Sequence, residues 1–312
     1  MRISTAFAAN SSLGNLQRRQ ESLAQSHEQL TSGRRVLRAS DDPAAAAQAE
    51  RALAAMARAE SQQRALEASR NAMQLSESAL GDAGEMLAQT RELIVSAGNG
   101  TYNDSQRQTI AESVRGLRND LLAVANRSDG TGRYLFGGQG SAGPPLLDAP
   151  GGVAYAGTAG QLNVAVGGQG QSNTPLSIDG RAAWLQAADP ANPGTNVSVF
   201  DVLDTAVADL LTPGRSSAQV AQTVSSALSG VDVAAGNLSA WRSRAGVALN
   251  RIDGIEGRLS QTKLDAERER SGAVDLDMVT AISDFQNRQT GYDAALKTYS
   301  LVQRMSLFDY LK

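Results

Sequence analysis

The stretch that decides the fold is residues 41–59, DDPAAAAQAERALAAMARA. Asp42 is a typical helix N-cap, and Pro43 stands at the first helical position, where its missing N–H costs nothing. Ten of the sixteen residues that follow are alanine, the strongest helix former. Apolar residues then recur at alternating steps of three and four as far as Val95. This pattern predicts a helix of roughly fifty residues, about 75 Å long, which suits a fibre or a long bundle better than a compact ball.

Both ends of the chain are amphipathic helices with no obvious place to bury their apolar stripes. The first helix is expected from about Ser11 to Leu30, with a natural stop at Gly33. Alternating steps of three and four keep one face of each helix towards a partner, as in a coiled-coil seam. The two ends could pair with each other inside one ordinary fold, or they could pair between the subunits of a polymer. The stripes consist of Leu13, Leu16, Gln20, Leu23, His27 and Leu30 at the first end and of Ile282, Phe285, Gln289, Tyr292, Leu296 and Tyr299 at the second.

The middle of the chain differs in character from both ends. Asn103 and Gln106 form a capping box that predicts a further helix, antiparallel to the first rod because the intervening turn is short. From Tyr134 to about Asn196 the chain is rich in glycine, proline and serine, which predicts a small β-rich insert. A short helix is expected over 199–211. The β-like pieces of the insert are 134–136, 161–166 and 176–178.

The layout is nested, because a second long rod runs from near Ser216 to Leu259 and a terminal helix follows Ser271 and Gly272. Glycines in this rod either weaken it or let other helices approach closely. The expected fold is mainly α with a β-rich insert: a long antiparallel helical bundle formed by the N- and C-terminal segments, with an outward β-rich lobe. The expected divisions are terminal coiled-coil segments 1–40 and 272–312, a helical rod of 41–133 and 215–271, and a lobe of 134–214 that ends in a short helix.

Composition excludes several classes of protein. The 312 residues are 41% hydrophobic but only 4% aromatic, which suits long helices packed on small side chains. A net charge of −3 provides no basic field for nucleic acid, and no apolar run is long enough to cross a membrane. Cysteine is absent, so disulfides and thiolate sites are excluded. Residues 1–20 contain no acidic side chain and no apolar core of a cleaved signal, so any export is expected to use an uncleaved polar start.

No pattern in the sequence points to catalysis, a cofactor or a metal. His27 is the single histidine, and it lies on the apolar stripe, where packing is the expected role. Residues 138–143 match the dinucleotide spacing G-x-G-x-x-G, but Pro144 and Pro145 follow where a helix would have to begin. The acidic pairs 41–42 and 275/277 lack the spacing of a calcium loop, and helix capping explains them.

Short segments near both ends resemble a known family. They are Met1–Thr5 (MRIST), Leu30–Val36 (LTSGRRV), Ser40–Ala44 (SDDPA), Asn99–Thr101 (NGT), Gly130–Gly138 (GTGRYLFGG), Arg244–Gly246 with Asn250 and Arg251, and Ser306–Leu311 (SLFDYL). In this order they are similar to the bacterial flagellin family, and within it to the flagellin-like hook-associated proteins of the hook–filament junction. The resemblance covers roughly the first 138 and the last 70 residues.

The resemblance implies a structural, non-enzymatic role in an extracellular flagellum, reached by type III export. It implies an export chaperone that covers the C-terminal stripe in the cytosol, a second hook-associated protein on the hook side and flagellin on the filament side. The chain could instead be the flagellin itself. A secreted adhesin or enzyme on a flagellin-like frame is a further alternative, which the lobe, with few convergent polar groups, does little to support.

Physical reasoning adds a mechanism to this resemblance. Free terminal stripes have too few partners to offset their ordering entropy, so they are expected to order when subunits pack head to tail in a helical assembly. Burial of apolar area at roughly 25 cal/mol per Å² would drive that ordering. The expected assembly residues are Leu13, Leu16, Leu23, Leu30, Ile282, Phe285, Tyr292, Leu296, Tyr299 and Phe308.

Overall fold

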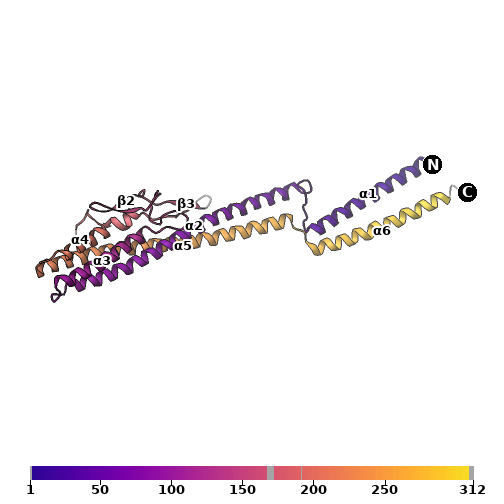
Figure 1. Ribbon diagram of the computed structural model, residues 1–312. Helices are drawn as coiled ribbons and strands as arrows, with labels where there is room; N and C mark the ends of the chain where they lie inside the picture. The colour runs from indigo at the N-terminus through magenta and orange to yellow at the C-terminus, as the bar shows by residue number, and fades with distance from the viewer. Residues whose placement is uncertain (1, 167–171, 191, 309–312) are drawn as a thin grey trace. The chain divides into compact units, whose positions relative to one another are not determined.

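The computed structural model describes residues 2–166, 172–190 and 192–308 (Figure 1). The chain is mainly helical with a small β-containing insert, which confirms the predicted fold class. It divides into two compact units, Met1–Ala59 with Ser260–Lys312 (the terminal unit) and Glu60–Leu259 (the central unit). None of the described helices combines the length and apolar character that crossing a bilayer requires. The six α-helices of the described chain are α1 (Arg2–Ser32), α2 (Pro43–Ala97), α3 (Asp104–Ala125), α4 (Val199–Leu211), α5 (Ser217–Val274) and α6 (Met278–Phe308).

The central unit holds the large hydrophobic core. Parts of α2 and α5 lie beside α3 and α4 there, and their alanine, leucine and valine side chains form one buried cluster. Ion pairs connect these segments: Arg127, two residues after the end of α3, reaches Asp82 of α2 over 2.8 Å, and Arg242 of α5 reaches Glu77 of α2 over 2.6 Å. The α3 capping box forms as predicted, because the side chain of Asn103 and that of Gln106 each accept the other's backbone N–H.

The insert consists of short antiparallel hairpins beside these helices. In the described part of the chain β1 (Leu146–Ala149) pairs with β2 (Gly152–Tyr155), β3 (Asn163–Val166) with β4 (Ser172–Pro175), and β5 (Ala187–Ala188) with β6 (Asn196–Val197). A π-helix, η1 (Arg181–Leu185), brings Trp184 edge-on to Phe136, with ring centroids 5.3 Å apart. Trp184 also stacks on Phe200 of α4, and all three rings belong to the large buried cluster, so they anchor the insert to the core of the central unit.

The predicted β-like pieces are only partly strands. Residues 163–166 form β3, but the segments 134–136 and 176–178 do not form strands. Tyr134 makes one isolated bridge to Ser128. The amides of Leu176 and Ile178 bond to Leu162 and Leu135, two different segments of the chain, so no ladder develops.

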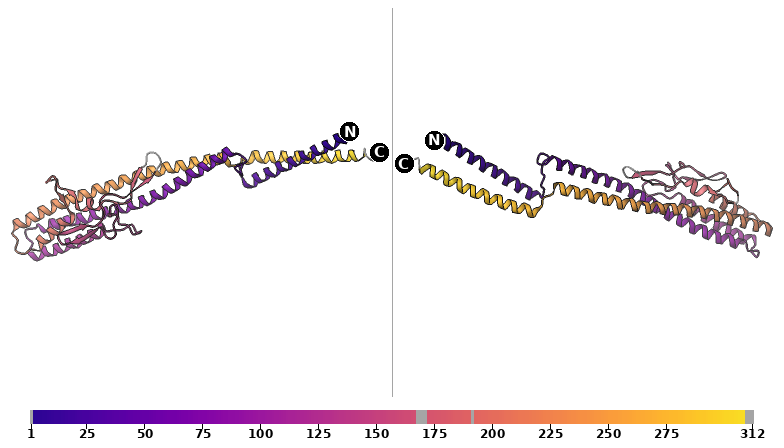
Figure 2. Two further views of the ribbon diagram at one scale, coloured as in Figure 1. Left: turned by 90° about the horizontal axis from the view of Figure 1, so that it is seen from above. Right: turned by 180° about the vertical axis from the view of Figure 1, so that it is seen from behind.

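The terminal unit pairs α1 with α6 and also contains the beginning of α2 and the end of α5. The start of α1 and the end of α6 lie side by side in every view (Figures 1 and 2). A small cluster of Val36, Ala45, Ala49, Ala273 and Val274 lies where the four helices end or begin.

Two helix bounds in this unit differ from the prediction. Helix α1 begins at Arg2 rather than Ser11, and α5 continues through Ser271 and Gly272 to Val274. The break falls at 275–277 instead. Asp275 there forms a bridge with Arg34, and Asp277 accepts the N–H of Val279 at 3.0 Å and so caps α6.

Candidate assembly interface

The two terminal helices meet along a seam that is only partly apolar. Leu16 is buried at 9% exposure. Ser26, ten residues further along α1, is also buried and donates its hydroxyl to the carbonyl of Ser22. Arg288 of α6 donates to the hydroxyl of Ser22 over 2.7 Å. The rings of His27 and Phe285 lie 6.1 Å apart, so the histidine lies beside the partner helix, but its side chain is exposed rather than packed into the seam. A seam with this many polar groups gains less from burial than a seam of leucines would.

The predicted assembly residues fall into two groups. One group, which includes Leu16, faces the seam and is buried or half-buried. The other is exposed: Leu13 by 45%, Ile282 by 45% and Leu296 by 41%. The side chain of Phe308 lies outside the described residues. The half-buried members are Leu23, Leu30, Phe285, Tyr292 and Tyr299.

The structure therefore brings the two ends together within one chain, as the intramolecular interpretation expects. It also leaves part of both stripes facing solvent. Neither observation tests whether these residues contact another subunit, so their assembly role stays a prediction.

Sequence reasoning missed four exposed apolar side chains in the same helices: Phe7, Met278, Val279 and Leu301, which are 76%, 44%, 78% and 60% exposed. Phe7, Val279 and Leu301 lie off the alternation of three and four that defines the seam, whereas Met278 lies one step of four before Ile282, the first residue of the predicted stripe. A search for any large apolar residue on these helices, rather than for one seam, would have found them.

Exposed apolar side chains are concentrated in the terminal unit. Among the described residues twelve large hydrophobic side chains are exposed, and nine of them belong to the terminal unit, although the central unit is the longer. The other three are Val95, Leu147 and Val247. Contiguous exposed apolar surface usually marks an interaction site.

The seam also contains a hollow of about 420 Å³, lined by Leu16, Arg19, Ala295, Thr298 and neighbouring side chains. Incomplete packing of this kind forfeits dispersion contacts. Among the described side chains of α1 and α6 only Leu16 and Ser26 are buried, so this pair buries far less than the core of the central unit.

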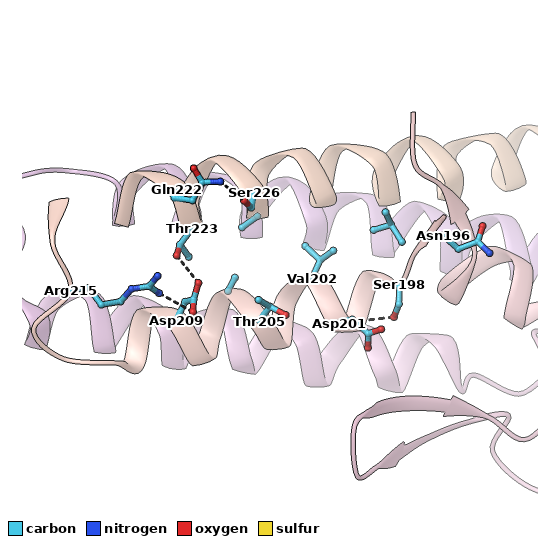
Figure 3. A pocket seen from close by; sticks show the side chains of 13 residues that line it. Asn196, Ser198, Asp201, Val202, Thr205, Asp209, Arg215, Gln222, Thr223 and Ser226 are labelled. Atoms are coloured by element: carbon cyan, nitrogen blue, oxygen red, sulfur yellow. Dashed lines mark hydrogen bonds and ion pairs between the residues drawn. The ribbon is translucent and has the colours of Figure 1, made fainter. Parts of the chain in front are cut away.

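A second hollow, of about 430 Å³, lies in the central unit between α4 and the start of α5 (Figure 3). Asp209, Thr223 and Arg215 lie at one end of it, and Asn196, Ser198 and Asp201 at the other. Thr223 donates its hydroxyl to Asp209 over 2.6 Å, and Arg215 pairs with the same carboxylate over 2.9 Å. These two contacts, with the hydroxyl hydrogen bond the larger, lower the pKa of Asp209. The polar groups at this end bond to one another. No sequence pattern predicts a site at this place.

The G-x-G-x-x-G match has a structural explanation. Gly138 has φ +64°, and a Cβ there would lie 1.8 Å from the carbonyl oxygen of Thr158. Its N–H donates to Ile178, and no helix begins at Pro144. The glycines therefore serve a tight turn, and the helix N-terminus that a pyrophosphate would need is missing at this point.

Asp42 accepts the N–H of Ala45 at 3.0 Å, which confirms its capping role.

Comparison with known proteins agrees with this architecture. Residues 3–141 match the family model for the bacterial flagellin N-terminal helical region. The chain is 30% identical to flagellar hook-associated protein 3 of Escherichia coli, over 100% of both chains. It is 25% identical to the flagellin of Bacillus subtilis, over 91% of this chain and 90% of that one.

Among solved structures, FlgL of Xanthomonas campestris shares the fold with a TM-score of 0.60 at 21% identity, covering 72% of this chain and 99% of that one. Terminal helices that pair within one chain, with a β-containing insert between them in the sequence, define a flagellin-like protein. The chain belongs to the family of flagellar hook-associated protein 3.

Proposed function

We propose that this chain is a structural part of the bacterial flagellum that joins hook to filament and templates flagellin polymerisation. The observation that carries the proposal is the concentration of exposed apolar side chains on α1 and α6, in a chain similar over its full length to flagellar hook-associated protein 3. The relatives reported above are named as flagellar structural components and none as an enzyme.

The terminal helices supply the assembly energy in this proposal. Burial of Leu13, Ile282 and Leu296 against neighbouring subunits would contribute roughly 25 cal/mol per Å² of apolar area. Intramolecular pairing of α1 with α6 leaves this area available, so a subunit can hold its own ends together and still bind its neighbours. Repeated head-to-tail contacts of one kind generate a helical array.

The partners follow from this position. Another hook-associated protein would contact the hook side, flagellin would contact the filament side, and a cytosolic chaperone would cover α6 until export. The protein would leave the cytoplasm without a cleaved signal peptide and act outside the cell. The three-part division into terminal segments, rod and lobe belongs to the same proposal.

The substitution Leu296→Asp tests the assembly role of α6. A carboxylate placed in an interface core carries a large desolvation cost, so the variant should be exported but absent from purified hooks. Leu147→Asp is a matched control, because Leu147 is 47% exposed but lies in the insert. We expect the control to be incorporated normally. Immunogold labelling of hooks, with an immunoblot of the medium, measures both. Normal incorporation of Leu296→Asp would refute the role of the exposed stripe.

Deletion of the gene distinguishes the junction role from the filament role, which the 25% identity to a flagellin keeps as the second candidate. Bare hooks with abundant flagellin in the medium would establish the junction role, because export continues without a base to build on. Bare hooks with no flagellin in the medium would mean that this chain is the filament subunit. Motile cells with complete filaments would contradict both roles.

A further inference from the structure

We propose that Arg35 is a positioning residue that latches the terminal helix pair to the ends of α2 and α5, so that load can pass between them. The latch lies in the terminal unit, in the short segments that join α1 to α2 and α5 to α6. We name these contacts, formed by residues 33–36 with 273–276, the clasp. The inference rests on the proposed junction function, because only a load-bearing joint needs a stiff connection at this place.

The backbone of the clasp is formed by two segments far apart in the sequence. The N–H groups of Arg35 and Val36 donate to the carbonyl of Val274 over 2.7 and 3.4 Å. The N–H of Leu276 donates to the carbonyl of Gly33 over 2.9 Å. Val274 ends α5, so its carbonyl has no partner within the helix and the clasp supplies one.

Arg35 joins three helix ends, two through its side chain and the third through its backbone carbonyl. One nitrogen, Nη2, donates to the carbonyl of Ala273 in the last turn of α5 over 2.6 Å. The other, Nη1, donates to Asp42, the N-cap of α2, over 3.2 Å. The carbonyl of Arg35 accepts the side-chain amide of Gln29, near the end of α1, over 2.8 Å.

The charges explain why an arginine is needed here. The C-terminal end of α5 presents carbonyl oxygens with partial negative charge, and Asp42 is a carboxylate. Arg35 is the cation that bonds to both. Its rigid fork can reach two acceptors in different directions, which one ammonium group does less well. Loss of the guanidinium would remove the cation that these two acceptors share.

The ion pair alone would not carry this inference. The side chains of Arg35 and Asp42 are 47% and 34% exposed, and pairs so exposed contribute little. The latch consists of the bonds that Arg35 forms with Ala273, Asp42 and Gln29, together with the neighbouring side chain of Val36, which is only 4% exposed. Without the clasp the segment 33–42 and the segment 275–277 would be two flexible joints in the path of the load.

Arg34 provides a matched control at the adjacent position. It is also an exposed arginine, but it joins the clasp through its backbone, which forms a bridge with Asp275. Removal of its side chain therefore leaves every contact of Arg35 in place.

Hydrogen exchange of the full-length chain measures the latch directly. In Arg35→Ala we expect the amides of Val36 and Leu276 to exchange about tenfold faster, with no change in the central unit. Arg34→Ala should match the native chain, and Arg35→Lys, which keeps the charge but not the fork, should fall in between.

The load-bearing role is measured in cells that lack the native gene. Both alanine variants should enter the junction as often as the native chain, but Arg35→Ala filaments should detach at a lower shear. Unchanged exchange and unchanged detachment in Arg35→Ala, or equal effects of Arg34→Ala, would overturn the latch. Absence of the native chain from the junction would refute the proposed function instead, and the exchange result would still decide whether the latch exists.

Discussion

At the scale of single residues, Arg118 shows how the insert is fixed to the helices of the central unit. Its side chain is 8% exposed, and it donates to both carboxylate oxygens of Asp204 in α4 over 3.0 Å each. It also pairs with Asp148 in β1 and lies 5.5 Å from the centre of the Phe200 ring. One guanidinium thus joins α3, α4 and the first hairpin.

We expect Arg118→Ala to lower the free energy of unfolding by about 2 kcal/mol, because it leaves two carboxylates without their cation. The value stays below that of a fully buried pair, since Asp148 and Asp204 are 60% and 44% exposed. Urea unfolding followed by circular dichroism measures it. Arg115→Ala is the control: Arg115 is 46% exposed and pairs with Glu112 on the same helix, so its loss should cost at most about 0.5 kcal/mol. Equal effects of the two substitutions would contradict the role assigned to Arg118.

Asp148 gives the same contact a pH dependence. The hydrogen bond from Arg118 holds the pKa of Asp148 below its usual value. A lowered pKa means that the carboxylate stabilises the fold above the unfolded pKa and loses this effect as the pH falls through the folded pKa. Asp148→Asn should therefore be less stable than the native chain at pH 7, and the difference should shrink below about pH 4. If the difference in stability persists at low pH, the stabilisation by Asp148 comes from the packing and hydrogen-bonding geometry of its side chain rather than from its charge.

At the scale of elements, the crossing of α4 and α5 depends on one glycine. A Cβ at Gly230 would lie 2.6 Å from a methyl carbon of Val202, so the two helices approach closely there. The other glycines of this rod do not serve this purpose. Gly236, Gly246 and Gly257 have open space where a Cβ would be, and Gly254 meets Arg258 only at 3.8 Å. Of the two roles that the sequence left open, close approach thus applies at Gly230.

Gly230→Ala should destabilise the central unit by about 1–3 kcal/mol, because overpacking outweighs the gain in helix propensity. Gly236→Ala on the same helix is the matched control, since Gly236 is exposed and has nothing within 4 Å. It should stabilise by up to about 1 kcal/mol. Thermal unfolding of both variants gives the comparison, and a stabilised Gly230→Ala would show that α4 can shift without cost.

Elements with a strong local signal could be predicted from the sequence. The capping box of α3 and the bounds of α4 are both as expected, because their caps and apolar spacing act locally. The end of α5 was placed too early at Ser271 and Gly272, since the true break depends on Asp275 pairing with Arg34. A contact between residues 241 positions apart leaves no local sequence pattern from which it could be predicted.

The strands were harder to predict for a related reason. The hairpin of β1 and β2 was missed, although Gly151 and Gly152 both take positive φ at its turn. The segment 176–178 is apolar enough for a strand, but its amides bond to separate segments rather than to one neighbour. Pairing of short strands is decided by tertiary contacts, so composition alone cannot assign it.

At the scale of the whole molecule, the candidate interface was predictable in part. The spacing identified the seam of α1 and α6, and Leu16 is buried in it. It did not identify Val279 or Leu301, which are among the most exposed apolar residues, because they lie off the seam. A search for one apolar stripe finds the partner within the chain and overlooks the surface left for other chains.

The cores of the two units are separate, and this predicts independent folding of the central one. Its large cluster runs from Ala72 to Ala245, and a smaller cluster joins Leu66 with Ile252 and Ile255. Both lie wholly within Glu60–Leu259. A fragment of residues 60–259 should therefore melt cooperatively, within a few degrees of the main transition of the full chain.

The terminal unit should behave differently, because its buried cluster consists of only five small residues and its seam is partly polar. Calorimetry of the full chain should show a weaker transition at lower temperature, which the fragment lacks. Hydrogen exchange should place that transition in α1 and α6. A fragment that fails to fold, or a single transition in which all helices melt together, would mean that the terminal helices stabilise the central core. The expectation that the terminal helices are weakly ordered in a free subunit and become ordered on assembly would then lose its physical basis.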